Sequence, residues 1–190
     1  MVTSGRARRE LTEHPVPHVC CRDAEITGML WFGGIPAAGT GDTLVDFEEL
    51  WLAQRLLTLT DRTVPAHLVP GDSCYRVRIK GPDGATTGRL STRDERMSAW
   101  PARDVRWCDA GSLWRGAFLT RGRVRRTGPG VAVDVRCPDL RSAHVLCRLA
   151  DQVGVPARRH TEWGWLAVTV SGAEHVGSLF TAMGAATATA

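Results

Sequence analysis

The sequence predicts an α+β protein made of two similar halves, each with the order helix, strand, strand, helix, strand, strand. Two short apolar helices, Ala24–Gly34 and Leu113–Gly122, each contain a central glycine and end on a glycine, and their final glycines are 88 positions apart. Val45–Phe47 and Val133–Val135 repeat at the same offset, and a Val-Pro-Ala run repeats at an offset of 91. This periodicity indicates a duplicated unit with a three-residue insertion in the second copy.

The first half follows from the spacing of apolar side chains and from turn residues. Residues 1–19 are polar and basic and contain two prolines, so we expect an N-terminal arm that docks loosely before the first helix. Periodic apolar positions and Gly- or Pro-rich turns then predict a helix at 20–32, a strand at 43–48, a helix at 49–60, and strands at 64–69 and 74–80. The Gly-rich polar stretch 81–96 is expected to begin a connector that reaches about residue 107.

The second half repeats this order over residues 108–185. Gly122 is expected to end the Leu113 helix in a left-handed cap, and Pro138 is expected to open the next helix. The remaining predicted elements are strands at 123–126 and 131–137, the helix from 138 to about 153, a strand that contains Val168 and Val170, and a closing helix at 173–183. The first half is therefore assigned to 20–96, and residues 186–190 form a tail of small residues.

Composition excludes several classes of protein. Of the 190 residues 43% are hydrophobic, and no run approaches the roughly 20 apolar residues of a membrane span. The net charge is +4, and nearly all of the basic residues are arginine, because Lys80 is the only lysine. None of the six cysteines has Cys-x-x-Cys spacing, so we expect neither a metal site nor a disulfide framework, but buried thiols in a cytoplasmic protein. The histidines are scattered, so no catalytic triad is proposed.

Several stretches of the sequence resemble a known family. The two glycine-bearing helices are similar to the paired helices of the LAGLIDADG homing-endonuclease fold, in which two helices pack closely at a pseudo-twofold axis. More specifically, the chain resembles the LAGLIDADG-like domain of the sporulation regulator WhiA family. The similar runs are Cys20–Arg22, Ala24–Glu25, Phe32–Gly34, Thr87–Gly88, Trp114–Leu119, Val135–Pro138 and Met183–Ala185.

Two departures from the family pattern bear on function. In active LAGLIDADG nucleases the penultimate residue of each motif is an acid that binds metal ions, and alignment on the terminal glycines places Gly33 and Arg121 at these positions. We therefore expect no metal, no cofactor and no nuclease activity. The WhiA family also carries a C-terminal helix-turn-helix domain, and no recognition helix follows within this sequence. The chain itself is expected to be complete, because it begins with Met1 and ends in an unlike tail.

The resemblance implies a saddle of two sheets that lies on duplex DNA. Strand alternation then predicts that Tyr75, Val77 and Ile79 face the core. The opposite positions and the neighbouring hairpin give seven candidate DNA contacts: Arg76, Arg78, Lys80, Arg121, Arg123, Arg125 and Arg126. A solvated arginine face without a partner is the alternative, because Asp46 is expected on the same face.

The tryptophans divide into two groups. Trp31 and Trp114 lie within the paired helices and are expected to fill the core. The offset of 91 places Trp165 on the saddle side, and Trp163 lies in the turn before it. Together they could stack on a base, line a small-molecule pocket or meet a protein, and a partly covered structural tryptophan is the alternative. Trp165 takes the place that Cys74 has in the first half.

Two functions stay open. The first is a non-catalytic, WhiA-like regulatory module that acts in transcription through weak DNA binding, contacts with a regulator protein, or both. The second is a scaffold repurposed to bind or transform a small molecule or peptide in a biosynthetic pathway. An open basic groove would favour the first, and an apolar cavity beside Trp165 would favour the second.

Overall fold

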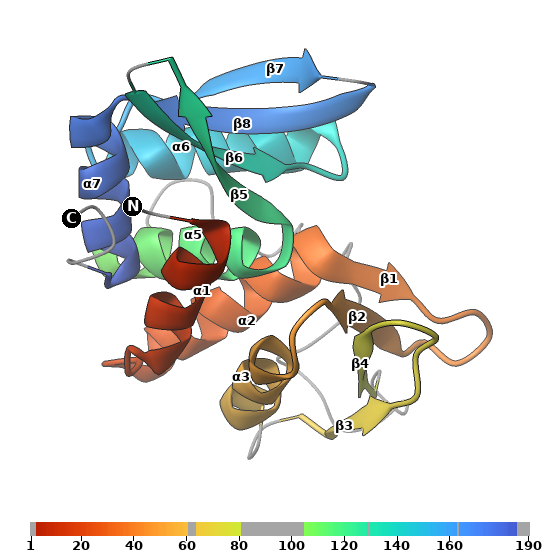
Figure 1. Cartoon of the computed structure of the whole chain (residues 1–190). Coiled ribbons are helices and arrows are strands. Elements are labelled where there is room, and N and C mark those ends of the chain that lie inside the picture. The colour runs from red at the N-terminus through yellow and green to blue at the C-terminus, as the bar shows by residue number, and fades with distance from the viewer. Residues whose placement is uncertain (1–2, 61–63, 81–104, 129, 163, 186–190) are drawn as a thin grey trace.

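The computed structural model describes residues 3–60, 64–80, 105–128, 130–162 and 164–185. Two separate four-stranded antiparallel sheets have the same strand order, β1-β2-β4-β3 and β5-β6-β8-β7, and the central helices α2 and α5 lie between them in Figure 1. The identical strand order confirms the duplicated fold predicted from the repeated sequence.

The first half has the predicted order, and the structure locates the strand before β2 that the residue pattern did not place. Its elements are α1 (Ser4–Glu13), α2 (Val19–Gly33), β1 (Gly34–Pro36), β2 (Thr43–Phe47), α3 (Leu50–Thr60), β3 (Ala66–Val69) and β4 (Tyr75–Ile79). The chain enters β1 directly from α2, and Gly34 pairs with Val45 of β2. With only three residues, β1 has too few positions to show a period of two.

The second half contains every element of the predicted order, including the strand β7, whose residues the apolar pattern did not locate. Its elements are α5 (Trp107–Arg121), β5 (Gly122–Thr127), β6 (Gly130–Arg136), α6 (Leu140–Gln152), β7 (Arg158–Glu162), β8 (Trp165–Ser171) and α7 (Ala173–Met183). Helix α6 starts at Leu140, two residues later than predicted, because Asp139 is its N-cap and forms a capping box with Ser142. The connector predicted at 81–96 and the tail lie outside the described residues.

The two central helices touch backbone to backbone at their glycines. A Cβ atom added to Gly28 would lie 2.3 Å from the carbonyl oxygen of Leu113, and one added to Gly116 would lie 2.2 Å from that of Glu25. Gly28 and Gly116 are 88 positions apart, and so are Glu25 and Leu113. The same contact is therefore made twice, which is the local signature of a pseudo-twofold axis through the helix pair.

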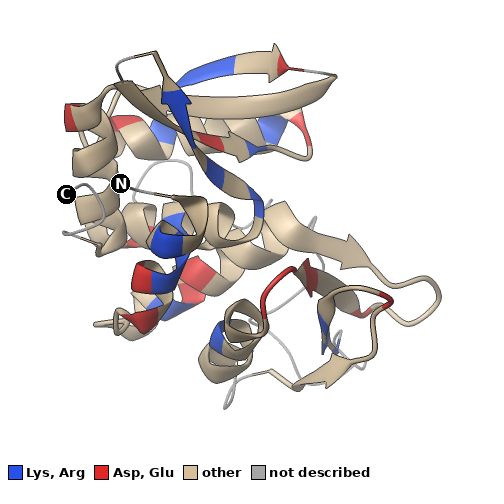
Figure 2. Cartoon of the chain, in the orientation of Figure 1, with Lys and Arg blue, Asp and Glu red and all other residues tan. Residues whose placement is uncertain are grey.

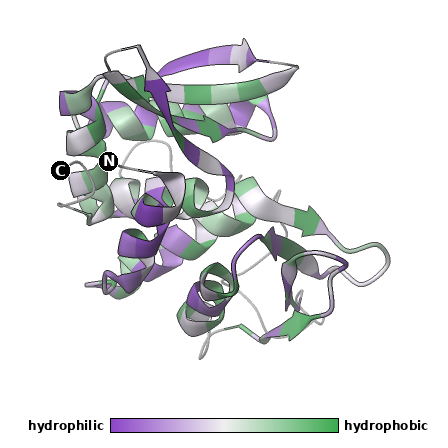
Figure 3. Cartoon of the chain, in the orientation of Figure 1, coloured by the Kyte–Doolittle hydropathy of each residue, from purple (hydrophilic) through white to green (hydrophobic). Residues whose placement is uncertain are grey.

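The core fills the space between the helices and the inner faces of the sheets, and Figure 3 shows hydrophobic positions along both the helices and the strands. Trp31 and Trp114 are 3% and 0% exposed, as expected from the sequence. The indole Nε1 of Trp114 donates a hydrogen bond to the carbonyl oxygen of Leu146 at 3.0 Å. Phe118 and Phe180 meet edge to face, with ring centroids 5.5 Å apart.

Two sequence expectations were wrong. The N-terminal segment is not a loose arm, because α1 buries Ala7 and Leu11 completely and donates from the Arg8 guanidinium to the carbonyl oxygen of Gly122 at 2.7 Å. Gly122 is not a left-handed cap, since its backbone is extended at φ −84° and ψ 150°. Glycine is needed there because a Cβ atom would lie 2.2 Å from the Phe118 ring.

Among the described residues, no helix combines the length and apolar character of a membrane span.

Candidate nucleic-acid interface

Each sheet has one face against the helices and one turned away from them, which we call the open face. In β4 the core side is occupied by Val77 and Ile79, which are 0% and 3% exposed, while Arg76 and Arg78 alternate onto the open face. Tyr75 was expected in the core, but it is 43% exposed at the start of the strand. Its register partner Phe47 on β2 is buried, at 3% exposed, but Tyr75 is the first residue of β4 and stays at the margin of the sheet.

The open face of the first sheet carries paired charges. Arg76 donates hydrogen bonds of 2.6 and 2.8 Å to the two carboxylate oxygens of Asp46, which faces it across β2 and β4. This hydrogen bonding, with the charge of Arg76, holds the pKa of Asp46 below its usual value despite partial burial. Arg78 lies 3.9 Å from Asp42, and the exposed Lys80 follows directly after β4.

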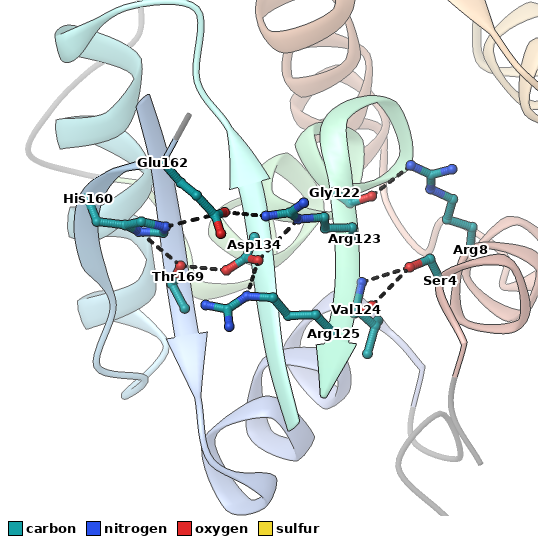
Figure 4. Close-up of polar contacts among 10 residues, drawn as sticks. All are labelled: Ser4, Arg8, Gly122, Arg123, Val124, Arg125, Asp134, His160, Glu162 and Thr169. Atoms are coloured by element: carbon teal, nitrogen blue, oxygen red, sulfur yellow. Dashed lines mark hydrogen bonds and ion pairs between the residues drawn. The ribbon is translucent and has the colours of Figure 1, made fainter. Parts of the chain in front are cut away.

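The open face of the second sheet is built around a buried acid, as Figure 4 shows. Asp134 on β6 is 1% exposed and accepts hydrogen bonds from Arg123 at 3.2 Å and from Arg125, both on β5. Thr169 on β8 donates to it at 2.6 Å. Arg123 also binds Glu162 on β7. The four strands are thus joined across their open face by side chains.

The electrostatics of Asp134 decide its charge state. Burial acts to raise the pKa of its carboxyl group, but hydrogen bonds from Thr169 and Arg125, and the charges of Arg125 and Arg123, outweigh burial and lower that pKa. Asp134 is therefore an anion at neutral pH. It neutralises part of the positive charge that the sequence analysis assigned to this face.

Other cations in this region face no acid. Among the described residues, no carboxylate lies within ion-pair distance of Arg126, Arg136 or Arg158, and all three side chains are exposed. Arg136 places its guanidinium 5.3 Å above the ring of Trp165, which is 57% exposed. Trp165 thus lies on the open face as predicted, whereas Trp163 lies outside the described residues. Figure 2 shows arginines following β5 toward the helix pair.

Arg136 and Arg158 are two open-face cations that were not among the predicted DNA contacts. Arg136 lies two residues after Asp134 on β6 and therefore shares its face. Arg158 pairs with Thr169 across β7 and β8 and lies on the same face as Thr169. The alternation of valines in β6 contained the signal for Arg136. The strand β7, however, has few apolar residues, so its period could not be read.

The ends of the paired helices hold no acid. Gly33 is buried against Thr120, and the Nε of Arg121 donates a hydrogen bond to the carbonyl oxygen of Phe32 at 3.2 Å. The structure therefore brings the two positions together at the shared end of α2 and α5, as the paired-helix interpretation requires. A glycine and a guanidinium provide no oxygen ligand from their side chains.

Comparisons with known proteins agree with this architecture. Residues 110–190 match the family model described as the WhiA LAGLIDADG-like domain. Probable cell division protein WhiA of Acidothermus cellulolyticus is 33% identical over 97% of this chain and 62% of its own length. The Rhodococcus opacus protein of the same name is 30% identical over the same shares. The chain thus spans about three fifths of the length of these relatives.

Solved structures show the same fold. The N-terminal LAGLIDADG domain of DUF199/WhiA superposes with a TM-score of 0.75 at 14% identity, and the match covers 95% of this chain and 91% of that one. The homing endonuclease I-DmoI in complex with DNA and Mn superposes with a TM-score of 0.60, also at 14% identity, over 88% of this chain and 98% of that one. The chain therefore has the LAGLIDADG homing-endonuclease-like fold, and its sequence is similar to that of WhiA proteins over 97% of its length.

Proposed function

We propose that this chain is a non-catalytic, WhiA-like regulatory module that binds duplex DNA weakly through the open faces of its two sheets. The observation that carries the proposal is the distribution of cations. Both open faces present arginines, and Arg136 and Arg158 have no carboxylate partner among the described residues. Arg126 is unpaired as well, but it alternates with Arg125 onto the other side of β5, opposite Val131, and is left out of the proposed contacts. A homing endonuclease with this fold has been solved in complex with DNA, which supports duplex DNA as the partner.

The ion pairs within each face explain why binding should be weak. Arg76 is held by Asp46, and Arg123 and Arg125 are held by Asp134. A phosphate must compete with these carboxylates for the guanidinium groups, so only the unpaired cations contribute their full effect. We therefore expect contacts to the phosphate backbone, low sequence specificity and a steep loss of affinity with salt.

DNA cleavage is not part of the proposal. Two-metal cleavage needs oxygen ligands at the shared end of the paired helices, and this position holds Gly33 and Arg121. The guanidinium of Arg121 would repel Mg²⁺. The chain would thus use the nuclease scaffold for binding, in the cell-division setting that the names of its relatives suggest.

A fluorescence anisotropy titration with a 30-base-pair duplex tests the proposal. The affinity should fall steeply between 50 and 200 mM salt, and should drop further in Arg136→Gln and Arg158→Gln, while Arg9→Gln on helix α1 should change little. Incubation of the duplex with Mg²⁺ should give no cleaved product. An absence of binding even at 50 mM salt would exclude the DNA route and leave contacts with a regulator protein as the basis of regulation.

The repurposed-scaffold alternative has less support. It predicted an apolar cavity beside Trp165, but this indole is 57% exposed and stacked under a guanidinium. A hollow of about 710 Å³ does lie between α1 and the start of α3, lined by charged side chains such as Arg6, Arg9 and Glu13. Its polar, open character does not suit an apolar small molecule.

A further inference from the structure

Three cysteines and an aspartate meet where the two central helices begin. The ligand atoms of Cys20, Cys21, Cys108 and Asp109 all lie within 4.8 Å of one another. The Sγ atoms of Cys20 and Cys21 are 4.0 Å apart, and the Sγ of Cys108 lies 3.5 Å from the Oδ1 of Asp109. Cys21 is buried and the other three side chains are partly exposed, so the cluster can be reached from solvent.

The cluster obeys the pseudo-twofold symmetry of the fold. Cys20 and Cys108 are 88 positions apart, as are Cys21 and Asp109. His18 and Arg106 are the respective N-cap residues of α2 and α5, so each helix contributes its second and third residues to the cluster. The cluster and the Gly33/Arg121 position therefore lie at opposite ends of the same helix pair. Neither helix start has a side-chain capping hydrogen bond.

These four atoms suit one class of ligand. Zinc prefers four-coordinate tetrahedral sites of thiolate, imidazole and carboxylate groups, with Zn–S distances of about 2.3 Å. The sulfur atoms of such a site lie about 3.8 Å apart. The Cys20–Cys21 separation is already close to this value, and the widest pair in the cluster would have to close by about 1 Å. A set of three sulfurs and one oxygen is too soft for Mg²⁺ or Ca²⁺.

We propose that Cys20, Cys21, Cys108 and Asp109 form a structural Zn²⁺ site that joins the beginnings of α2 and α5. Four protein ligands fill a tetrahedral shell and leave no position for substrate, so the ion stabilises the fold and does no chemistry. It ties the two halves together at one end of the helix pair, while the Gly28 and Gly116 contacts hold the middle. The sequence analysis missed this site because the ligands come from two adjacent pairs in different halves, not from Cys-x-x-Cys spacing.

Cobalt substitution of the purified full chain tests the site. The protein is freed of metal with a chelator under reducing conditions and then titrated with Co²⁺. One equivalent should produce thiolate-to-cobalt charge-transfer absorption and the intense visible bands of tetrahedral Co²⁺, and one equivalent of Zn²⁺ should remove both. Elemental analysis of protein purified without chelator should find about one zinc per chain, and bound zinc should raise the melting temperature.

Variants separate the site from nonspecific thiol binding. Cys20→Ser and Cys108→Ser should each weaken Zn²⁺ binding by at least 10-fold and reduce the charge-transfer absorption, and Asp109→Asn should retain the sulfur bands with a lower affinity. Cys147→Ser removes a partly buried thiol outside the cluster and should leave the titration unchanged. Circular dichroism checks that each variant is folded.

Two results would overturn the proposal. One is an octahedral Co²⁺ spectrum without charge-transfer absorption in the folded wild-type protein. The other is a loss of two mass units per chain on mild oxidation, together with no zinc binding by the reduced protein. Two thiols that give two protons and two electrons to the oxidant form a disulfide, so this result would make the cluster a disulfide pair.

Discussion

The guanidinium of Arg115 lies 2.6 Å from the carboxylate of Glu25, and the two side chains are 2% and 0% exposed. Each comes from one of the paired central helices, so this ion pair crosses the pseudo-twofold interface. Arg55 of α3 donates to both oxygens of the same carboxylate at 2.9 and 3.0 Å, and Arg115 also donates to the carbonyl oxygen of Met183 at 3.0 Å. A polar network therefore connects α2, α3, α5 and the end of α7 inside the core.

Removal of one partner of this pair should be costly. Arg115→Met leaves the Glu25 carboxylate with only Arg55 in the core, and we expect the free energy of unfolding to fall by about 3–5 kcal/mol. Urea denaturation followed by circular dichroism measures this. Arg9→Met breaks an exposed pair with Glu13 within one helix and should cost less than about 1 kcal/mol. Equal losses in the two variants would show that burial does not strengthen the central pair.

The central helices contact each other so closely that Gly28 and Gly116 should not tolerate a larger residue. Gly116→Ala should destabilise the fold by about 1–3 kcal/mol or more, because the new methyl group would meet the backbone oxygen of Glu25, which cannot rotate away. Gly5→Ala on α1 is the matched control, since a Cβ atom there meets nothing within 4 Å. Alanine should slightly stabilise that helix. Thermal melts of both variants decide the matter, and a neutral Gly116→Ala would contradict the helix geometry.

Stability should fall in acid as the open-face carboxylates are protonated. The pKa values of Asp46 and Asp134 are lower in the folded chain than the ordinary value of 3.8. Their contribution is therefore complete above about pH 4 and is lost as the pH falls through the lowered values. Melting temperatures between pH 7 and pH 2.5 should show this loss, and Asp134→Asn should flatten it. Asp151→Asn, an exposed change on α6, should retain the wild-type profile.

The same acid should restrain DNA binding. Asp134→Asn frees Arg125 for phosphate, while Arg123 keeps its pair with Glu162, so the slope of log affinity against log salt should steepen by roughly 1, with tighter binding at low salt. The amide of the new side chain can still accept the Thr169 hydrogen bond, which protects the local fold. Anisotropy titrations at several salt concentrations measure the slope. An unchanged affinity would mean that DNA does not use this face.

The first helix should be part of the folding unit. Leu11 is fully buried, and its replacement by alanine should cost about 2–5 kcal/mol. Arg9→Ala in the same helix removes an exposed side chain and should cost little. Denaturation midpoints compare the two. If Leu11→Ala left the free energy of unfolding unchanged, residues 4–13 would be a loosely docked arm and not part of the folding unit.

Repetition made much of the fold readable from the sequence. Glycines, valine-rich strands and turn residues recur at fixed offsets, and local rules place a helix or strand at each. The duplicated order required the short strand β1 and the polar strand β7, but their residues could not be located, because a hydrophobic period needs several apolar positions to be visible. Helix α1 was not predicted, because its two buried side chains, Ala7 and Leu11, lie among charged residues and give no clear apolar period.

The candidate interface was readable only in part. Alternation placed Arg76, Arg78, Arg123 and Arg125 on the open faces, but it could not show which acids neutralise them. The pairing of Arg123 and Arg125 with Asp134 depends on the register of β5 against β6, which backbone hydrogen bonds fix. The net charge that a face offers to DNA is therefore a property of the sheet and not of its strands.

By itself, the sequence determined the duplication, the paired glycine-bearing helices and the presence of Gly33 and Arg121 where a nuclease needs acids. These are local features, and each follows from residue type and spacing. Only the tertiary structure decided that Glu25 is buried between Arg55 and Arg115, that Asp134 neutralises the second open face, and that Cys20, Cys21, Cys108 and Asp109 meet. Such groups are far apart in the chain, and only the close packing of two helices or the register of two strands brings their charges and ligand atoms within reach.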